Sequence, residues 1–183
     1  MSQVMLFNKP FQVLSQFTDT EGRQHLGDYI EAPGYYAAGR LDYDSEGLMV
    51  LTDHGPTQHL ISGQNMEKTY LVQVEGRPIK AQLDRLRHGV SVKDYVAKAV
   101  AVEMLSKKPG WLWARTPPIR QRKNSPTSWL QLTLNQGKNR QVRRMCAAVG
   151  LPVLRLIRIR VGAFTLNGLA PGQWVIKDFS NSM

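Results

Sequence analysis

Hydrophobic and polar positions along this chain form short runs and alternations, which predict many short strands and a few short helices. Strands are expected within residues 4–17, where Lys9-Pro10 interrupts them, and at 35–38, 48–51, 68–75, 98–104, 130–134, 153–161, 163–166 and 174–177. Helical segments are expected at 26–30, at 56–61, from Ile79 to Gly89, and at 139–149. Because the strands and helices follow no regular βαβ repeat, the order favours an α+β fold with a mainly antiparallel mixed β-sheet and flanking helices.

The clearest helix is the segment from Asn139 to Val149. Its apolar side chains recur at helical spacing and form one stripe, made of Val142, Met145, Cys146 and Val149. Asn139 is the expected N-cap, and Gly150 is the expected glycine after the last turn. The helix should therefore bury one face and expose the other.

Charge adds a partner class to this outline. The 183 residues include 24 Lys and Arg against 14 Asp and Glu, a formal charge of +10. Such an excess favours polyanions, nucleic acid first, because neutralised phosphates release counterions; the alternative is a generally basic protein. Many cations fall in two stretches: Lys107, Lys108, Arg115, Arg120, Arg122 and Lys123, then Lys138, Arg140, Arg143, Arg144, Arg155, Arg158 and Arg160. The second group is expected to bind phosphates through the ladder of Arg155, Arg158 and Arg160.

The stretch 106–127 is a long basic segment with four prolines and two tryptophans. Segments of this length inside a compact domain are usually functional or mobile, and RNA or DNA contact is expected here. Trp111 and Trp113 could stack on bases or anchor the segment to the body of the domain, and both interpretations stay open.

Several chemistries lack their sequence signature. The four histidines are scattered, no Gly-rich phosphate loop or Gly-x-Ser-x-Gly elbow is present, and the single cysteine, Cys146, lies in the apolar helix stripe. These absences argue against a zinc site, nucleotide hydrolysis and a serine or cysteine nucleophile. No long apolar run or charged leader suggests membrane insertion or export, and one cysteine fits a reducing cytoplasm.

Carboxylate chemistry remains, and Asp42 is its best candidate. Asp42 follows Gly39-Arg40 and precedes Gly47, which opens the apolar strand 48–51. A carboxylate on a loop anchored by buried segments is either a catalytic group or an ordinary turn residue. In the helix 139–149, Arg143 lies at the border of the buried face, so its charge needs an acidic partner, for which Asp42 is a candidate. Arg140 and Arg144 lie nearly opposite that face and are phosphate-binding or ordinary surface charges.

Three motifs together resemble one known family. Gly39-Arg40-Leu41-Asp42, followed by Ser45, Gly47 and the strand that ends in Leu51-Thr52-Asp53-His54-Gly55, resembles motif I of the ribosomal RNA pseudouridine synthases of the RsuA type. Lys68-Thr69-Tyr70 is similar to the second motif, and Asn139-Arg140-Gln141-Val142-Arg143-Arg144-Met145 to the third. Asn8-Lys9-Pro10 also matches, so the resemblance covers nearly the whole chain. Ser45 replaces the usual threonine, and Asp53-His54-Gly55 replaces the commoner Asn-Asp-Gly.

The resemblance implies a fold and a reaction. The fold is the pseudouridine synthase catalytic fold, expected as a single domain over 1–183 with two lobes dividing near residue 75 and no N-terminal accessory RNA-binding module. The reaction isomerises one uridine to pseudouridine in ribosomal RNA, expected to be that of the large subunit, without a cofactor. The expected substrate is a structured RNA, such as a hairpin, and the expected protein is a cytoplasmic monomer. The alternative is a basic RNA-binding or ribosome-assembly protein that catalyses nothing.

The resemblance also assigns roles to residues. Asp42 is the implied catalytic carboxylate, which either adds to the ribose or removes the C2′ proton. Tyr70 should lie against the target base, and Arg143 should pair with Asp42. Arg40 is placed to fill the gap left by the extruded uridine. The other implied substrate-binding residues are Leu154, Lys138, Arg140 and Arg144.

Overall fold

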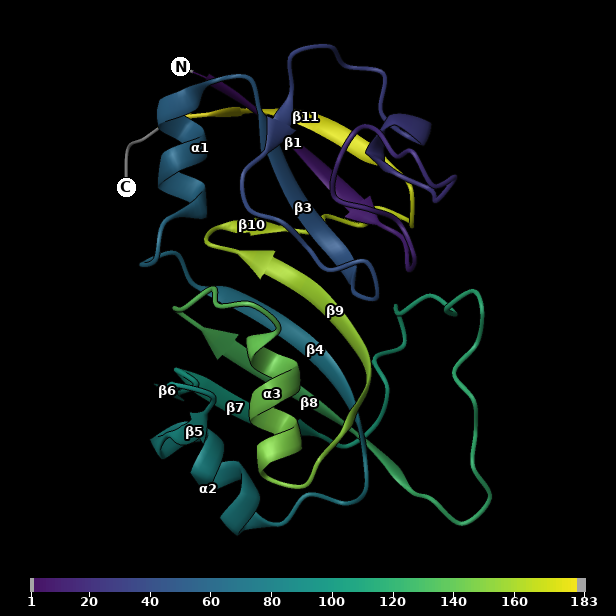
Figure 1. The fold of residues 1–183 in the computed structure, drawn as a ribbon, viewed down its shortest axis with the longest axis vertical. Helices are drawn as coiled ribbons and strands as arrows, with labels where there is room; N and C mark the ends of the chain where they lie inside the picture. Colours follow the sequence, from purple (N-terminus) through teal and green to yellow (C-terminus); the bar gives the residue numbers. More distant parts are fainter. Residues whose placement is uncertain (1, 181–183) are drawn as a thin grey trace. The chain divides into compact units, whose positions relative to one another are not determined.

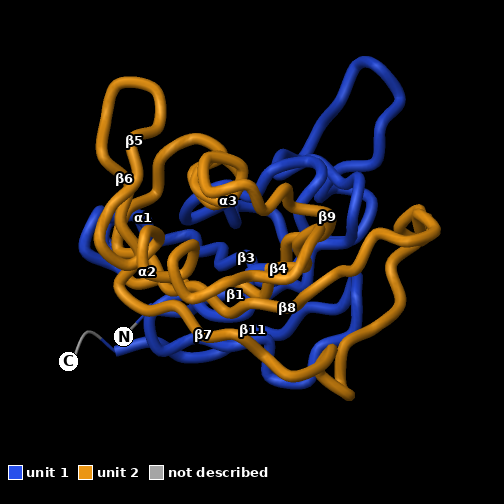
Figure 2. The backbone as a smooth tube through the Cα atoms, turned by 90° about the horizontal axis from the view of Figure 1, so that it is seen from below, with its two compact units in different colours: residues 1–66, 158–183 blue, residues 67–157 orange. Residues whose placement is uncertain are grey.

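The computed structural model describes residues 2–180, which form two compact units (Figure 2). Unit 1 comprises the described parts of residues 1–66 and 158–183, and unit 2 comprises residues 67–157. Strand β9 (Val153–Val161) begins in unit 2 and ends in unit 1. Unit 1 is therefore assembled from two separate stretches of chain, whereas unit 2 is one continuous stretch.

Unit 1 is built around the N-terminal strand. Its elements are β1 (Ser2–Lys9), a 3-10 turn η1 (Leu26–Asp28), β2 (Tyr36–Ala37), β3 (Glu46–Thr52), α1 (Gly55–Ser62), the end of β9, β10 (Phe164–Thr165) and β11 (Trp174–Phe179). Strand β1 lies between β3 and β11 and pairs antiparallel with both, so that Val4 faces Thr52 on one side and Lys177 on the other (Figure 1). All seven residues of β3 are buried. Unit 1 thus places a fully buried strand directly after the segment that contains Asp42.

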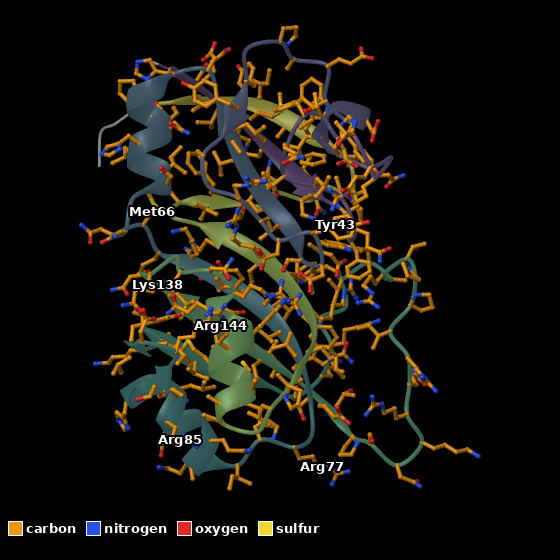
Figure 3. The ribbon with its side chains drawn as sticks, viewed as in Figure 1. Tyr43, Met66, Arg77, Arg85, Lys138 and Arg144 are labelled. Carbon is orange, nitrogen blue, oxygen red and sulfur yellow. The ribbon has the colours of Figure 1, made fainter. Side chains whose placement is uncertain are left out.

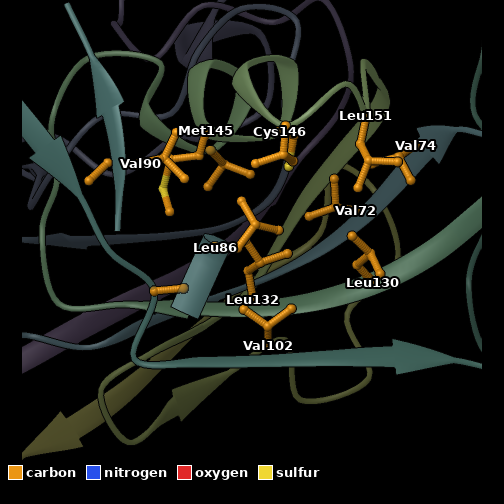
Figure 4. Packing of buried hydrophobic residues seen from close by; sticks show 14 of the residues in the cluster. Val72, Val74, Leu86, Val90, Val102, Leu130, Leu132, Met145, Cys146 and Leu151 are labelled. Atoms are coloured by element: carbon orange, nitrogen blue, oxygen red, sulfur yellow. The ribbon is translucent and has the colours of Figure 1, made fainter. Parts of the chain in front are cut away.

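Unit 2 packs two helices on a small antiparallel sheet. Its elements are β4 (Lys68–Glu75), α2 (Lys80–His88), β5 (Val90–Val92), β6 (Tyr95–Ala97), β7 (Ala101–Leu105), β8 (Thr127–Leu134), α3 (Gln141–Ala148) and the start of β9. Strand β8 pairs antiparallel with both β4 and β7. Leu86 from α2 and Met145 from α3 share one apolar core with Leu132 from β8 (Figure 4). This core fixes the two elements that contain Tyr70 and Arg143.

The sequence-based outline of this fold is largely confirmed. The α+β class is correct, and the strands predicted at 68–75 and 153–161 have the predicted bounds. The apolar stripe of α3 is buried as expected. No helix within residues 2–180 is long and apolar enough to pass through a membrane.

Some local predictions are wrong. Residues 11–17 form no strand, because Gln12 adopts a positive φ of 58° and Leu14 bonds instead to Gln24, its N–H donating to that carbonyl over 2.9 Å. Ile79 is 62% exposed, because it is the N-cap residue of α2 and not part of its buried face. The strand predicted at 98–104 begins only at Ala101, and the preceding hairpin of β5 and β6 was not predicted.

Candidate active site

Asp42 lies on the short segment that joins β2 to β3, residues 38–45, here called the Asp42 loop. Gly39 has a φ of +89°, a region that disfavours residues with a Cβ, and this glycine lets the chain turn before Asp42. Leu41 is buried in the apolar core of unit 1, next to Met49 and Phe7. Asp42 itself is half-buried. A core residue thus anchors the loop immediately before the carboxylate.

The backbone on both sides of Asp42 is held by hydrogen bonds. The buried Ser15 hydroxyl donates to the Leu41 carbonyl, and the Leu41 N–H donates back to Ser15 Oγ over 3.1 Å. The Gln12 N–H donates to the Tyr43 carbonyl over 2.9 Å. Both neighbours of Asp42 are therefore fixed to the segment that follows β1.

Arg158, at the start of the β9 portion in unit 1, is a buried part of the same framework. It is 4% exposed, its Nε donates to the Leu48 carbonyl over 2.8 Å, and its Nη1 lies 3.5 Å from the Arg40 carbonyl. The prediction that Arg155, Arg158 and Arg160 form a phosphate-binding ladder is wrong for two of the three, because Arg155 and Arg158 are buried. Arg158 instead connects the Asp42 loop, at Arg40, to strand β3, at Leu48.

Lys9 is a second buried cation in unit 1. Its Nζ donates to the carbonyls of Pro10 and Val13, each over 2.8 Å. Burial lowers the pKa of Lys9 from 10.5 to about 7, although the carboxylates of Glu46, Asp44 and Asp42 oppose that shift and Arg158 adds to it. The carboxylate of Asp42 therefore shares its surroundings with two buried cationic side chains that sequence reasoning missed. Each had only a weak sequence signal: Lys9 lies close after the apolar run 4–7, and Arg158 lies between two isoleucines.

Arg40, the proposed substitute for the extruded base, is exposed at the start of the loop. Its Nη2 donates to the side-chain oxygen of Gln16 over 3.2 Å, while its backbone is tied to Arg158. The side chain is thus at the surface on a fixed backbone, as a residue that inserts into an RNA stack would need to be.

Tyr70 lies in β4, directly opposite Leu132 of β8. It is half-buried and packs against the apolar core of unit 2. One part of the ring is therefore held by the core, and the rest is accessible to a ligand.

The third motif surrounds the start of α3, and one detail differs from the prediction. The helix begins at Gln141, and its N-cap is Arg140, which has a left-handed backbone (φ 52°, ψ 33°), so Asn139 is not the N-cap. Asn139 instead accepts a hydrogen bond from Arg144 Nη2 over 3.2 Å. The Gln141 side chain accepts from the Lys138 N–H over 3.3 Å and donates to Gln136 over 2.9 Å. Side chains of α3 thus hold the turn that precedes the helix, and no side chain among the described residues caps its first turn.

Three of the predicted substrate-binding cations gather at this end of unit 2. Lys138 and Arg140 are exposed, and Arg144 is half-buried. Lys138 Nζ lies 4.9 Å from the centre of the Tyr95 ring. Figure 3 shows Lys138 and Arg144 near the first turn of α3. Cations next to a helix N-terminus form a surface suited to phosphate.

Arg143 and Leu154 are both half-buried in unit 2. Burial raises the pKa of Cys146, one turn from Arg143, to about 12, although the Arg143 charge acts in the opposite direction. Cys146 is therefore a protonated core thiol, as its place in the apolar stripe predicts.

Asp42 and Arg40 belong to unit 1, and the other predicted site residues belong to unit 2. The pairing of Arg143 with Asp42 stays a prediction. Within residues 2–180, no cluster of three His, Cys, Asp or Glu could hold a metal ion.

Comparison with known proteins identifies the family. The model of the RNA pseudouridylate synthase family matches residues 3–148. The chain belongs to this family. As an RNA pseudouridine synthase it is an enzyme that isomerises uridine, and the resemblance of its three motifs is confirmed.

Named relatives of the synthase cover nearly its whole length. It is 51% identical to the ribosomal large subunit pseudouridine synthase E of Vibrio vulnificus over 94% of its own residues and 74% of that protein. It is 48% identical to the protein of the same name from Xanthomonas campestris, over 96% and 95%. Synthase E is also the member of the family that the sequence by itself favours. A solved structure described as a pseudouridylate synthase has a TM-score of 0.76 at 24% identity, covering 97% of the synthase and 71% of that chain, which shows a shared fold.

Proposed function

We propose that this synthase converts one uridine of large-subunit ribosomal RNA to pseudouridine. The observation that most supports the proposal is the identity of about half to relatives named ribosomal large subunit pseudouridine synthase E, which extends over 94% or more of this chain. The positive charge of +10 agrees with an RNA substrate. A cytoplasmic location and action as a monomer on an RNA hairpin belong to the same proposal.

The reaction is an isomerisation. The N1–C1′ glycosidic bond breaks, the uracil turns within the site, and a C5–C1′ bond forms in its place. The proton originally on C5 is then removed, and N1 ends protonated, so atoms and charges balance without a redox partner. The enzyme must therefore supply a carboxylate beside the ribose, a group that accepts the C5 proton, and a surface that holds the free base.

We assign these tasks to residues of the three motifs. Asp42 acts at the ribose, either by adding to it or by removing the C2′ proton. Tyr70 stacks on the uracil, and its hydroxyl accepts the C5 proton while passing its own proton on to solvent. Arg143 pairs with Asp42 and orients its carboxylate. The hydrogen bonds of Ser15 and Arg158 support the assignment of Asp42, because a carboxylate that must meet one carbon atom needs a fixed backbone.

The remaining residues bind the RNA around the target. Arg40 fills the space left by the extruded uridine, which offsets part of the few kcal/mol that unstacking costs. Lys138, Arg140 and Arg144 contact phosphates, which gives affinity without sequence information. Leu154 contributes an apolar surface in unit 2. In this arrangement unit 1 and unit 2 serve as one catalytic domain.

The direct test measures tritium released from ribosomal RNA that contains 5-tritiated uridine. The wild-type protein should release tritium, and Asp42→Asn should release it at least about a thousandfold more slowly, a loss of about 4 kcal/mol in transition-state stabilisation. The variant should bind the same RNA with unchanged affinity, and Asp53→Asn, at the exposed position directly after β3, is the matched control.

The non-catalytic alternative predicts a different outcome. A ribosome-assembly protein would bind the RNA without releasing tritium, and Asp42→Asn would alter its stability alone. Activity retained by Asp42→Asn would also contradict the proposed role. Mapping pseudouridines in ribosomal RNA from cells with and without the gene then locates the target nucleotide.

A further inference from the structure

The residues between β7 and β8, 106–126, form neither helix nor strand and are here called the basic segment (Figure 1). A groove of about 610 Å³ lies between this segment and the adjoining parts of β4, β8 and β9, entirely within unit 2. That volume falls in the range of sites for small organic ligands, and one nucleotide fits it. The proposed function places one RNA-binding residue, Leu154, in this groove but names no ligand for the groove itself.

The wall formed by the basic segment is held in place by its own contacts. Arg155, which is 5% exposed, donates from Nη2 to the Trp113 carbonyl over 2.9 Å, and its guanidinium carbon lies 5.9 Å from the centre of the Trp113 ring. Leu112 is buried. Trp113 therefore anchors the basic segment to the body of unit 2. For this tryptophan, anchoring is favoured over stacking on bases. A groove with anchored walls presents its charges in a reproducible geometry.

The groove has three kinds of lining. Cationic side chains come from Lys108, Arg115, Arg120, Arg122 and Arg155. Apolar surface comes from Leu154 and Trp129, and uncharged hydrogen-bonding groups come from Gln73 and Thr127, whose side chains bond over 3.3 Å. Glu75 also lines the groove, with its carboxylate 3.8 Å from Arg122 Nη1. These three kinds of group correspond to three parts of a nucleotide. Cations suit its phosphate, apolar side chains suit the face of its base, and an amide suits the edge of the base.

We propose that this groove binds an unpaired nucleotide of the substrate RNA, distinct from the uridine that is isomerised. The phosphates on either side of it lie against Lys108 and Arg120, its base lies on Leu154, and Gln73 reaches the edge of that base. The proposal rests on the proposed function for the identity of the substrate. It adds a second position at which the enzyme examines single-stranded RNA, and hence a source of target selection.

Binding of fluorescein-labelled hexauridylate, measured by anisotropy with the full chain, tests the groove without requiring turnover. The double variant Lys108→Gln with Arg120→Gln removes one lysine and one arginine from the groove, where both are exposed. Arg85→Gln with Lys98→Gln removes the same charges from exposed positions elsewhere in unit 2, and neither residue lines the groove. The groove variant should bind about tenfold more weakly at low salt, with a salt dependence reduced by about 1.4 in log–log slope. The control should change less than twofold.

Gln73→Leu tests recognition of the base. It should weaken hexauridylate by roughly threefold without changing the salt slope, because an uncharged hydrogen bond is lost. An abasic ribose-phosphate hexamer should bind the wild type more weakly than hexauridylate does. It should bind Gln73→Leu and the wild type with equal affinity, because it has no base for Gln73 to contact. Hexaglutamate that competes as well as hexauridylate would mean a site for acidic peptides, and equal losses in the two double variants would mean general charge attraction; either result overturns the proposal.

The tritium assay separates this proposal from the proposed function. If both hold, the groove variant raises KM for ribosomal RNA about tenfold with little change in kcat. If the wild type releases no tritium and the groove variant still binds hexauridylate more weakly than the wild type, the proposed function is refuted and the groove site stands. An active enzyme whose groove variant has unchanged KM and unchanged binding would refute the groove site alone.

Discussion

The Asp42 loop and the basic segment are both irregular stretches that lead into a strand, but they are held in opposite ways. The Asp42 loop has eight residues, and buried side chains from two distant parts of unit 1, Ser15 and Arg158, bond directly to its backbone. The basic segment is attached through Leu112 and Trp113, and most of its charged residues are exposed.

This difference agrees with the tasks that we propose for the two stretches. Bond rearrangement at one ribose requires a carboxylate positioned to a fraction of an ångström, so the backbone itself must be fixed. Attraction of phosphate varies slowly with distance, so long side chains on a segment anchored at a few points suffice. Substitutions should therefore alter stability and kcat in the Asp42 loop, and affinity and salt dependence in the basic segment.

The largest expected effect is that of Arg158→Met. It leaves the carbonyls of Leu48 and Arg40 without a buried donor, at about 1 to 3 kcal/mol for each unsatisfied group, so the free energy of unfolding should fall by about 3 to 5 kcal/mol. In the folded protein kcat should fall by at least about tenfold. Chemical denaturation and the tritium assay measure the two effects. Arg160→Met, at an exposed position of the same strand, should change stability by less than about 0.5 kcal/mol, and an equal loss in both variants would contradict the role of Arg158.

Lys9→Met should reveal a pH-dependent contribution to stability. The folded pKa of about 7 lies below the ordinary 10.5, so between these values the unfolded chain binds more protons. The stability contributed by Lys9 is then complete above pH 10.5 and is lost as the pH falls to 7. The wild type should gain on the order of 3 kcal/mol relative to Lys9→Met between pH 7 and pH 10. Denaturation at several pH values measures this, with exposed Lys177→Met as control; a constant difference would refute it.

Ser15→Ala should have a smaller effect of the same kind. It leaves the N–H and carbonyl of Leu41 without their side-chain partner, which costs about 1 to 3 kcal/mol. Because Asp42 is the next residue, kcat should fall severalfold while KM is retained. Ser62→Ala, which removes an exposed hydroxyl bonded to a helix carbonyl, is the matched control and should leave kcat unchanged. A change in KM alone would assign Ser15 to RNA binding.

The smallest effect on the fold is expected for Lys123→Gln in the basic segment. Lys123 is exposed, so the free energy of unfolding should change by less than about 0.5 kcal/mol. If Lys123 contacts one phosphate, the salt slope for hexauridylate should decrease by about 0.7. A measurable loss of stability would show that the basic segment is more firmly attached than its few anchors indicate.

Local patterns predicted those parts of the molecule that local physics determines. The stripe of Val142, Met145 and Cys146 determined α3, and the apolar run after Gly47 determined β3. The family motifs supplied roles that spacing alone left open for Asp42 and Tyr70. The wrong N-cap at Asn139 arose because Gln141 and Arg144 satisfy the turn through side chains that the capping pattern does not include.

The buried cations were missed for a different reason. An arginine such as Arg158 is buried only where carbonyls accept its protons, and those carbonyls belong to Arg40 and Leu48, more than a hundred residues earlier. Lys9 likewise depends on a turn at Val13 that the predicted strand did not contain. Charge counting therefore assigned Arg155 and Arg158 to the surface, where an isolated arginine usually lies.

The discontinuity of unit 1 also sets an order of events on the ribosome that makes this chain. Strand β1 is synthesised long before β11, one of its two strand partners. Unit 2 is contiguous and can fold as soon as it emerges, whereas the Asp42 loop must wait for Arg158 to leave the exit tunnel. During translation unit 2 is therefore nearly complete before the Asp42 loop acquires its bond to Arg158.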